Sequence, residues 1–337
     1  MPARSKHERR RVQNSGFFGI ILLMKKRLLS GIQPSGTIHI GNYFGAIKQF
    51  VDLQGEYDSS VFIADLHAIT TVQDKEKLSN YILNVAMDYL ACGLDPKKVT
   101  LFKQSDIPEV TELTWYFNCL TTMPYLERAT SYKDATQKAK DVTVGLFDYP
   151  ILMAADILIQ DADVVPVGAD QKQHVEYARD TAQKFNNAFG ETFKLPESFI
   201  LDNVAVVPGT DGRKMSKSYG NTIPLFGTDE EIKKAVMSIV TDSGTGIPEN
   251  VYNIHKLFKS ASELDAFYEE NKGSYKTLKE ALAQDIIDFI TPAREKRKYY
   301  ENHIEEVKEI LKSGAEKAKI QVLKKMEDVR NKVGVNI

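Results

Sequence analysis

The stretch LLSGIQPSGTIHIGNYFGAI, residues 28–47, decides the fold of this chain of 337 residues. It begins with an apolar run, Leu28 to Ile32, that fits a buried strand, and QPSG at 33–36 then supplies turn-forming residues. Beyond the turn, apolar residues recur with a helical period: Tyr43, Ile47, Phe50 and Val51. We therefore expect a strand, a glycine-rich turn and a helix that begins near residue 41 and ends at Gly55.

A turn of this kind suits the binding of a phosphate group. A helix N-terminus presents unpaired N–H groups and the positive end of its dipole, and glycines let a phosphate approach the backbone closely. The stretch offers Gly36, Gly41 and Gly45, and His39 and Asn42 add side-chain donors where the helix begins. An ordinary strand, turn and helix with a chance histidine is the alternative interpretation.

Composition narrows the class of protein. A chain of this length suggests roughly two domains, and 42% hydrophobic with 27% charged residues is typical of a globular protein. The formal net charge of -2 excludes a globally basic nucleic-acid binder, although local basic patches remain compatible with it. Cys92 and Cys119 are far apart, so we interpret them as reduced thiols of a cytoplasmic protein and expect no metal site.

The first 23 residues differ from the rest of the chain. MPARSKHERRRVQNS is basic and polar, and FFGIILL is too short to span a membrane. A secretory signal is the alternative, but no small-residue cleavage site follows the apolar run. We expect residues 1–23 to be a non-native or disordered extension, with the folded protein beginning at Met24 and making no use of a membrane.

Strand and helix patterns alternate after the opening stretch. Strands are expected at 61–65 and 99–103, with a helix over about 75–92 between them. This order predicts an α/β protein with a Rossmann-like, doubly wound parallel sheet. The glycine spacing does not fit G-x-G-x-x-G and no Walker lysine follows, which argues against dehydrogenases and P-loop proteins.

Polar residues then follow strands or interrupt apolar helices. His67 comes directly after the strand at 61–65, at the sheet edge where open α/β sheets bind ligands. Asp156 shares an apolar helix face with Met153 and Ile157, and a carboxylate there needs a partner. A strand at 164–168 leads to a helix that begins near Asp170, a plausible N-cap, with Gln171 and His174 one turn apart.

The second half carries a lysine-serine cluster. A strand at 204–207 precedes a glycine-rich loop and then RKMSKS at 213–218. Two lysines on such a loop are able to close over a polyphosphate and neutralise charge on a leaving group. Beyond Thr228 we expect helices at 230–240, 253–258, 263–269, 275–289 and from about Pro292 onward, which form a helical bundle.

HIGN at 39–42 together with KMSKS at 214–218 resembles the signature pair of the class I aminoacyl-tRNA synthetases. The surrounding words SGIQPSGTIHIGNYFGAI, MAADIL and VPVGADQKQHVEYARD are similar to the bacterial tryptophanyl-tRNA synthetase family, from about Met24 to the C-terminus. The resemblance implies activation of L-tryptophan with ATP, release of pyrophosphate, and transfer of tryptophan to tRNA(Trp). It further implies Mg²⁺ as cofactor and a homodimer, with residues near 125–132 close to the interface.

The resemblance also assigns site residues. Catalysis would involve His39, Asn42, Lys133, Lys214 and Lys217. The nucleotide would be held by Gln33, Pro34, Ser35, Gly41, Asn42, Gly168, Ala169, Asp170, Val206, Lys214, Met215, Ser216, Lys217 and Ser218. Tryptophan would be bound by His67, Tyr149, Met153, Asp156, Val165, Val167 and Gln171, with Asp156 accepting from the indole N–H. Core packing is the alternative role for Met153, Val165 and Val167.

Two positions depart from the family. Leu29 stands where the family often has phenylalanine, so one aromatic wall is missing, and Ala135 stands where a second lysine is usual. The family also implies a division into a catalytic nucleotide-binding domain (24–206), the KMSKS loop with a helical anticodon-binding domain (207–302), and a C-terminal helix that packs back on the catalytic domain (303–337).

Three rival functions remain at this point. A tyrosine-specific synthetase shares the fold and signature pair, but QPSG, HIGN and MAADIL favour tryptophan. A non-catalytic RNA-binding relative would have no need of the intact histidine and lysines of the signature pair. A small-molecule nucleotidyltransferase would have no need of the long helical C-terminal part.

Overall fold

The computed structural model describes residues 25–34, 36–137, 141–167, 172–200, 207–241 and 246–337. Its centre is a five-stranded sheet in the order β3-β2-β1-β4-β5, in which every neighbouring pair is parallel. The strands are β1 (Arg27–Ile32), β2 (Asp58–Ile63), β3 (Val99–Lys103), β4 (Val164–Val167) and β5 (Glu197–Ile200). The predicted doubly wound parallel sheet is confirmed, and its order reverses at β1, where such sheets bind ligands.

The pairing of the central strand opens a crevice at that point. β1 follows β2 along its whole length, from Arg27 opposite Asp58 to Ile32 opposite Ile63. Its register with β4 comprises the single pair Leu28 and Val164, near the start of both strands. The carboxyl-terminal part of β1 is therefore not joined to β4, and the two strand ends have room for a ligand between them.

The helix after β1 is irregular. Its segments are α1 (Ile40–Asn42), a π-helical turn (Tyr43–Ile47) and α2 (Lys48–Leu53), so the regular helix predicted to reach Gly55 ends two residues earlier and contains an unforeseen π turn. A π turn inserts one residue into the helix, which changes the face on which side chains lie. The consecutive rings of Tyr43 and Phe44 both pack on Phe289, at centroid distances of 5.6 and 5.9 Å.

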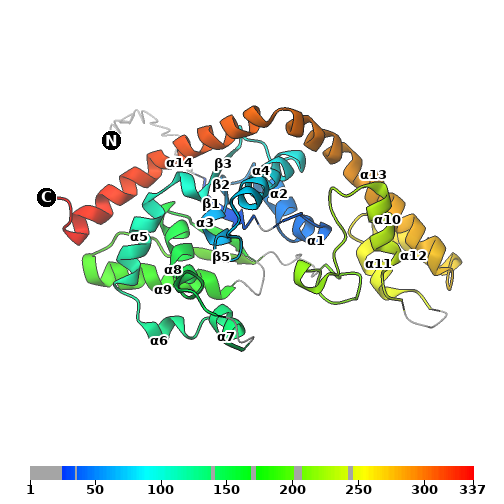
Figure 1. Ribbon diagram of the computed structural model, residues 1–337, viewed down its shortest axis with the longest axis horizontal. Helices are drawn as coiled ribbons and strands as arrows, with labels where there is room; N and C mark the ends of the chain where they lie inside the picture. The colour runs from blue at the N-terminus through cyan, green and yellow to red at the C-terminus, as the bar shows by residue number, and fades with distance from the viewer. Residues whose placement is uncertain (1–24, 35, 138–140, 168–171, 201–206, 242–245) are drawn as a thin grey trace, which may run out of the picture.

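Further helices precede the C-terminal part: α3 (Asp65–Ala68), α4 (Lys75–Ala91), α5 (Glu109–Asn118), α6 (Met123–Leu126), α7 (Thr130–Gln137), α8 (Val144–Ile159) and α9 (Lys172–Phe189). α4 covers one face of the sheet and α5, α8 and α9 cover the other, whereas α6 and α7 lie beyond α8 and α9 (Figure 1). The strand predicted at 61–65 ends earlier, because the Asp65 carboxylate accepts from the backbone N–H of Leu66 and Ser105 and begins α3. β5 was not foreseen. Of the strand predicted at 204–207, the structure describes Val207 alone.

The C-terminal part is helical, with α10 (Asp229–Met237), α11 (Glu249–His255), α12 (Ala261–Glu270), α13 (Tyr275–Asn302) and α14 (Ile304–Val333). We call α10 to α13 the helical unit. The interruption predicted before Pro292 is wrong, because α13 runs through this proline and the chain instead breaks at His303, where φ is -129°. The helix continues past the missing N–H of Pro292 because its apolar face, with Ile286 and Ile290, stays buried.

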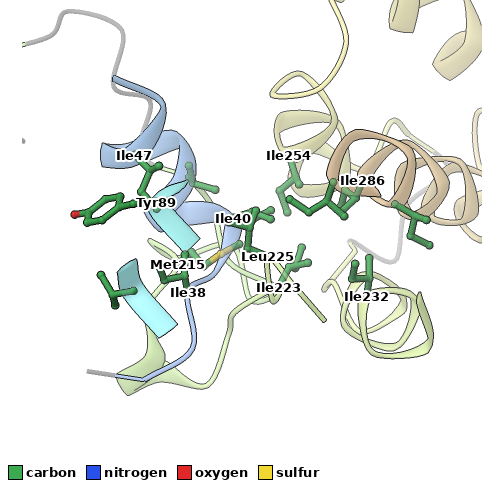
Figure 2. Close-up of a cluster of buried hydrophobic side chains, with 14 of the residues drawn as sticks. Ile38, Ile40, Ile47, Tyr89, Met215, Ile223, Leu225, Ile232, Ile254 and Ile286 are labelled. Carbon is green, nitrogen blue, oxygen red and sulfur yellow. The ribbon is translucent and has the colours of Figure 1, made fainter. Parts of the chain in front are cut away.

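Two hydrophobic cores lie on opposite faces of the sheet. One includes Phe62 and Phe102 with apolar residues of α5, α8 and α9. The other includes Ile63 and Leu101 and continues into the helical unit. Figure 2 shows this continuation, in which Ile40 of α1 lies with Ile223 and Leu225 between Ile47 and Tyr89 on one side and Ile254 and Ile286 on the other. The sheet and the helical unit therefore share one core.

α14 belongs to both cores because it crosses the edge strand β3. In Figure 1, α13 and α14 form a long arc from the helical unit over the sheet to the C-terminus. Val307 packs in the core that includes Ile63 and Leu101, Val322 packs in the core that includes Phe62 and Phe102, and Gly314 lies at the crossing. A Cβ at Gly314 would stand 1.8 Å from Leu101 O, so a glycine is required there. No helix among the described residues is long and apolar enough to cross a membrane.

Candidate active site

A cavity of about 460 Å³ lies at the carboxyl ends of β1, β2 and β4, beside α8 and the start of α9. Its walls contain many of the residues assigned to the amino acid: His67, Tyr149, Met153, Asp156 and Val165, together with Gln33, Pro166 and His174. Mostly apolar walls with a few convergent polar groups are typical of a small-molecule site. The structure thus brings together residues from four separate parts of the sequence.

The polar centre of this cavity is the carboxylate of Asp156. The side chain is 6% exposed, and Oδ2 lies 3.0 Å from His67 Nε2. Gln104 Nε2 donates to both carboxylate oxygens, at 2.9 and 2.8 Å. Burial raises the pKa of Asp156, while the hydrogen bonds from His67 and Gln104 act in the opposite direction. The acid on the apolar helix face has the partners that its burial requires.

Gln104 is a site residue that our sequence analysis missed. It is 1% exposed and follows β3 directly, whereas His67 lies four residues after the end of β2, on α3. Its Oε1 accepts from the backbone N–H of Leu66 at 3.1 Å and of His67 at 3.3 Å, so one amide orients both the carboxylate and the chain that carries His67. The rule that pointed to His67, a polar residue at the carboxyl end of a parallel strand, would have found it.

Aromatic and apolar groups complete the walls. The His67 and Tyr149 rings pack edge to face with their centroids 6.1 Å apart, and the centroids of the Tyr149 and His174 rings are 5.7 Å apart. Leu29 lines the cavity from β1, so this wall is aliphatic, as its sequence predicts. Gln33 Nε2 donates to His67 O at 3.2 Å, which connects the turn after β1 with the segment after β2.

The HIGN segment lies at the start of α1, and its His39 is six residues along the chain from Gln33 in the cavity wall. His39 is 7% exposed, and burial, with a smaller effect from the charge of Lys217, lowers its pKa to about 4. Its ring is therefore neutral at pH 7, and Nδ1 makes no hydrogen bond to any residue in the described part of the chain. Asn42 Oδ1 accepts from His39 N at 3.1 Å, so this amide also caps the helix.

The KMSKS loop packs directly on the HIGN segment. Ile40 N donates to Ile223 O at 3.1 Å, and Met215 is buried so close to Gly41 that a Cβ there would lie 3.2 Å from Met215 Cβ. At Gly36, where φ is +107°, an added Cβ would lie 3.7 Å from Lys217 Nζ. Burial lowers the pKa of Lys217. The signature segments, remote in sequence, therefore converge on one region.

Other predicted residues are less closely connected with the cavity. Pro34 is buried after β1, and Ser218 Oγ lies 2.9 Å from Ser216 Oγ on the KMSKS loop. Lys133 is exposed on α7, and no contact described for it reaches the cavity. Several predictions lie outside the described residues: Ser35, Gly168, Ala169, Asp170, Gln171 and Val206, with the side chains of Ala135 and Val167. Within the described ranges, no cluster of three His, Cys, Asp or Glu residues is arranged to hold a metal ion.

A parallel sheet that ends in an amino-acid-sized cavity, with HIGN and KMSKS side by side, defines a class I aminoacyl-tRNA synthetase. The family model described as tRNA synthetases class I (W and Y) matches residues 24–308, and the chain belongs to this family. It is an enzyme of this class.

Relatives place it on the tryptophan branch. The tryptophan–tRNA ligase of Fusobacterium nucleatum is 51% identical over 92% of this chain and 98% of its own length. That of Rhodopirellula baltica is 47% identical over 92% and 99%. A crystal structure of tryptophanyl-tRNA synthetase from Campylobacter jejuni, complexed with ADP and tryptophan, is 48% identical and superposes with a TM-score of 0.86 over 91% of this chain and 99% of its own. A tyrosyl-tRNA synthetase from Archaeoglobus fulgidus, 22% identical, shares the fold.

Proposed function

We propose that this protein charges tRNA(Trp) with tryptophan in two steps. The carboxylate of L-tryptophan attacks the α-phosphate of ATP, which forms tryptophanyl-adenylate and releases pyrophosphate. The ribose hydroxyl at the tRNA end then attacks the acyl carbon, which forms the ester and releases AMP. The observation that carries the proposal is the buried Asp156 carboxylate in the wall of an apolar cavity at the strand ends, in a chain whose HIGN and KMSKS segments pack on each other.

The Asp156 carboxylate supports tryptophan as the amino acid. An indole presents a wide apolar body and a single N–H donor, and an ionised carboxylate accepts about four hydrogen bonds. Gln104 and His67 together use part of this capacity. We propose that the indole N–H takes a remaining position, with Met153 and Val165 against the ring and His67 near the polar end of the substrate.

The signature segments provide the groups for ATP. We propose that the neutral His39 ring donates to a phosphate oxygen and that Lys214 and Lys217 neutralise the charge that develops on pyrophosphate. No covalent enzyme intermediate is involved, so catalysis consists of positioning and charge stabilisation. We further propose that the other predicted nucleotide residues, from Gln33 to Gly41 and from Gly168 to Asp170, surround the adenosine and the phosphates.

Mg²⁺ fits this arrangement as a companion of the nucleotide. Mg²⁺ is commonly held by substrate phosphates and water with few protein ligands, and the lysines and amides of the site leave the phosphate oxygens available to it. When bound, it would neutralise phosphate charge. We propose that it enters with ATP.

The remaining parts of the chain suggest partners. We propose that residues 207–302 contact the anticodon and that residues 24–206 and 303–337 form the catalytic part.

We also propose a homodimer, which is supported by exposed apolar side chains on the consecutive helices α5 and α6: Trp115 is 68% exposed and Met123 is 61% exposed. Sedimentation of the wild-type protein and of Trp115→Arg would test this interface.

The exchange of labelled pyrophosphate into ATP tests activity and substrate together. The assay is run with L-tryptophan and, separately, with L-tyrosine at the same concentration. We expect exchange with tryptophan and at most a trace with tyrosine. Equal exchange with both amino acids would contradict the substrate, and exchange with neither would contradict the proposed activity.

A further inference from the structure

The KMSKS segment begins on the second arm of a tight hairpin. Pro208 and Lys214 form an antiparallel bridge, Gly209 N donates to Arg213 O at 2.6 Å, and Met215 N donates to Val207 O at 2.9 Å. These bonds order the hairpin as far as Met215. They do not reach the chain beyond it, which leads to Lys217 and must follow a defined course if the lysine is to meet a phosphate.

The side chain of Asn221 supplies the missing bonds. It is 2% exposed, and its Oδ1 accepts from Ser216 N at 2.8 Å. Its Nδ2 donates to Lys214 O at 3.1 Å and to Asp211 Oδ1 at 2.6 Å. One amide thus binds the backbone on both sides of Met215 and connects it to the hairpin, with its acceptor and both donors in use.

The hairpin is shaped to receive this amide. A Cβ at Gly209 would lie 2.3 Å from Asn221 Nδ2, so a glycine is required where the side chain enters. Asn221 O also accepts from Thr210 N at 2.9 Å. The hydrogen bond from Asn221 is the largest cause that lowers the pKa of Asp211, which keeps this carboxylate ionised and able to accept.

We propose that Asn221 is a positioning residue for adenylate formation, because its side chain fixes the backbone of Lys214 and Ser216 and thereby the course of both KMSKS lysines. It acts through the loop and does not touch a substrate. The inference rests on the proposed function of the loop. It predicts a defect in the step that uses ATP, with the amino-acid cavity unaffected.

The test compares Asn221→Ala with Asn250→Ala. Asn250 is a matched control, because its amide also lies against the hairpin, 2.8 Å from a Cβ placed at Gly212, but donates to Val240 O at 3.2 Å and not to the KMSKS backbone. The readouts are the rate of tryptophan-dependent pyrophosphate exchange, the KM for ATP, and tryptophan affinity by equilibrium dialysis without ATP. The dialysis also reports whether the cavity is folded.

We expect Asn221→Ala to slow exchange about 10- to 100-fold, as for a misplaced catalytic group, while tryptophan affinity and the Asn250→Ala variant stay within about twofold of wild type. Asn221→Ser, whose hydroxyl is too short to bind both sides of Met215, should behave likewise and decides the matter if the alanine variant loses tryptophan binding. Exchange at the wild-type rate in a folded Asn221 variant would overturn the inference. Absent exchange in the wild type would instead overturn the proposed function.

Discussion

At the scale of single residues, Asp156 shows how a buried charge acquires a function. The sequence placed it on an apolar helix face, and the structure adds the His67 and Gln104 bonds that offset part of the cost of burying a carboxylate there. The carboxylate was predictable because an acid in an apolar pattern is a conspicuous exception. Gln104 was not predicted, although the rule applied to His67, a polar residue after a parallel strand, applies to it as well.

We expect Asp156→Asn to weaken tryptophan binding by about 10- to 100-fold, the effect of losing a hydrogen bond to a charged acceptor, with a much smaller change in the KM for ATP. Equilibrium dialysis with tryptophan and exchange kinetics with ATP measure the two effects. Asp52→Asn, at an exposed carboxylate paired with Lys48, is the control for the chemical change itself. Equal losses for the two ligands would assign Asp156 a structural role.

Lys214 is expected to act mainly in the transition state. Charge shifts to pyrophosphate as the adenylate forms, so its interaction should be stronger there than with bound ATP. We expect Lys214→Ala to lower the single-turnover rate of adenylate formation by about 100-fold or more and to leave tryptophan affinity unchanged. Rapid-quench measurement with the exposed Lys312→Ala variant as control tests this, and an unaltered rate would refute the role.

At the scale of elements, local pattern predicted most of the sheet and tertiary packing decided the exceptions. The strand Val99–Lys103 has the predicted bounds, since its apolar run is flanked by turns. The helix α13 passes through Pro292, where the sequence favoured a break, because its buried face continues on both sides. The π turn after HIGN left no local signal, since it places Tyr43 and Phe44 against a ring of α13 far along the chain.

The crossing of α14 over β3 gives the prediction at this scale. Replacing a helical glycine by alanine normally stabilises a protein by up to about 1 kcal/mol, but a Cβ at Gly314 would clash with Leu101 O. We expect Gly314→Ala to lower the free energy of unfolding by about 2 kcal/mol or more, as for other forced overpacking. Urea denaturation measures it, with Ser313→Ala on the same turn as control. A stabilised Gly314→Ala variant would show that α14 does not approach β3 this closely.

At the scale of the whole molecule, the helical unit is joined to the sheet by a shared core and by a buried ion pair. Arg297 on α13 donates from Nε to Asp88 Oδ1 at 2.6 Å and from Nη2 to Asn84 Oδ1 at 3.0 Å, both on α4. Asp88 is 3% exposed, and burial raises its pKa to about 6 although Arg297 acts against this. Sequence patterns predicted a parallel sheet and a helical bundle but not this link, because its residues are 209 positions apart.

The Arg297–Asp88 pair makes the stability of the contact between the helical unit and the sheet depend on pH in a defined direction. A carboxyl group whose pKa is higher in the folded state favours folding while it is protonated, so its contribution falls as pH rises from about 4 to 6. Arg297→Met removes the partner and leaves a buried carboxylate, which costs about 3–5 kcal/mol when ionised. We therefore expect this variant to lose much stability at pH 8 and far less at pH 5, and denaturant unfolding at both pH values measures the loss.

The double variant Asp88→Asn with Arg297→Met has no charge to bury and should recover stability at pH 8. If Arg297→Met is equally unstable at both pH values, or the double variant fails to recover, then apolar contacts rather than this pair hold the helical unit on the sheet.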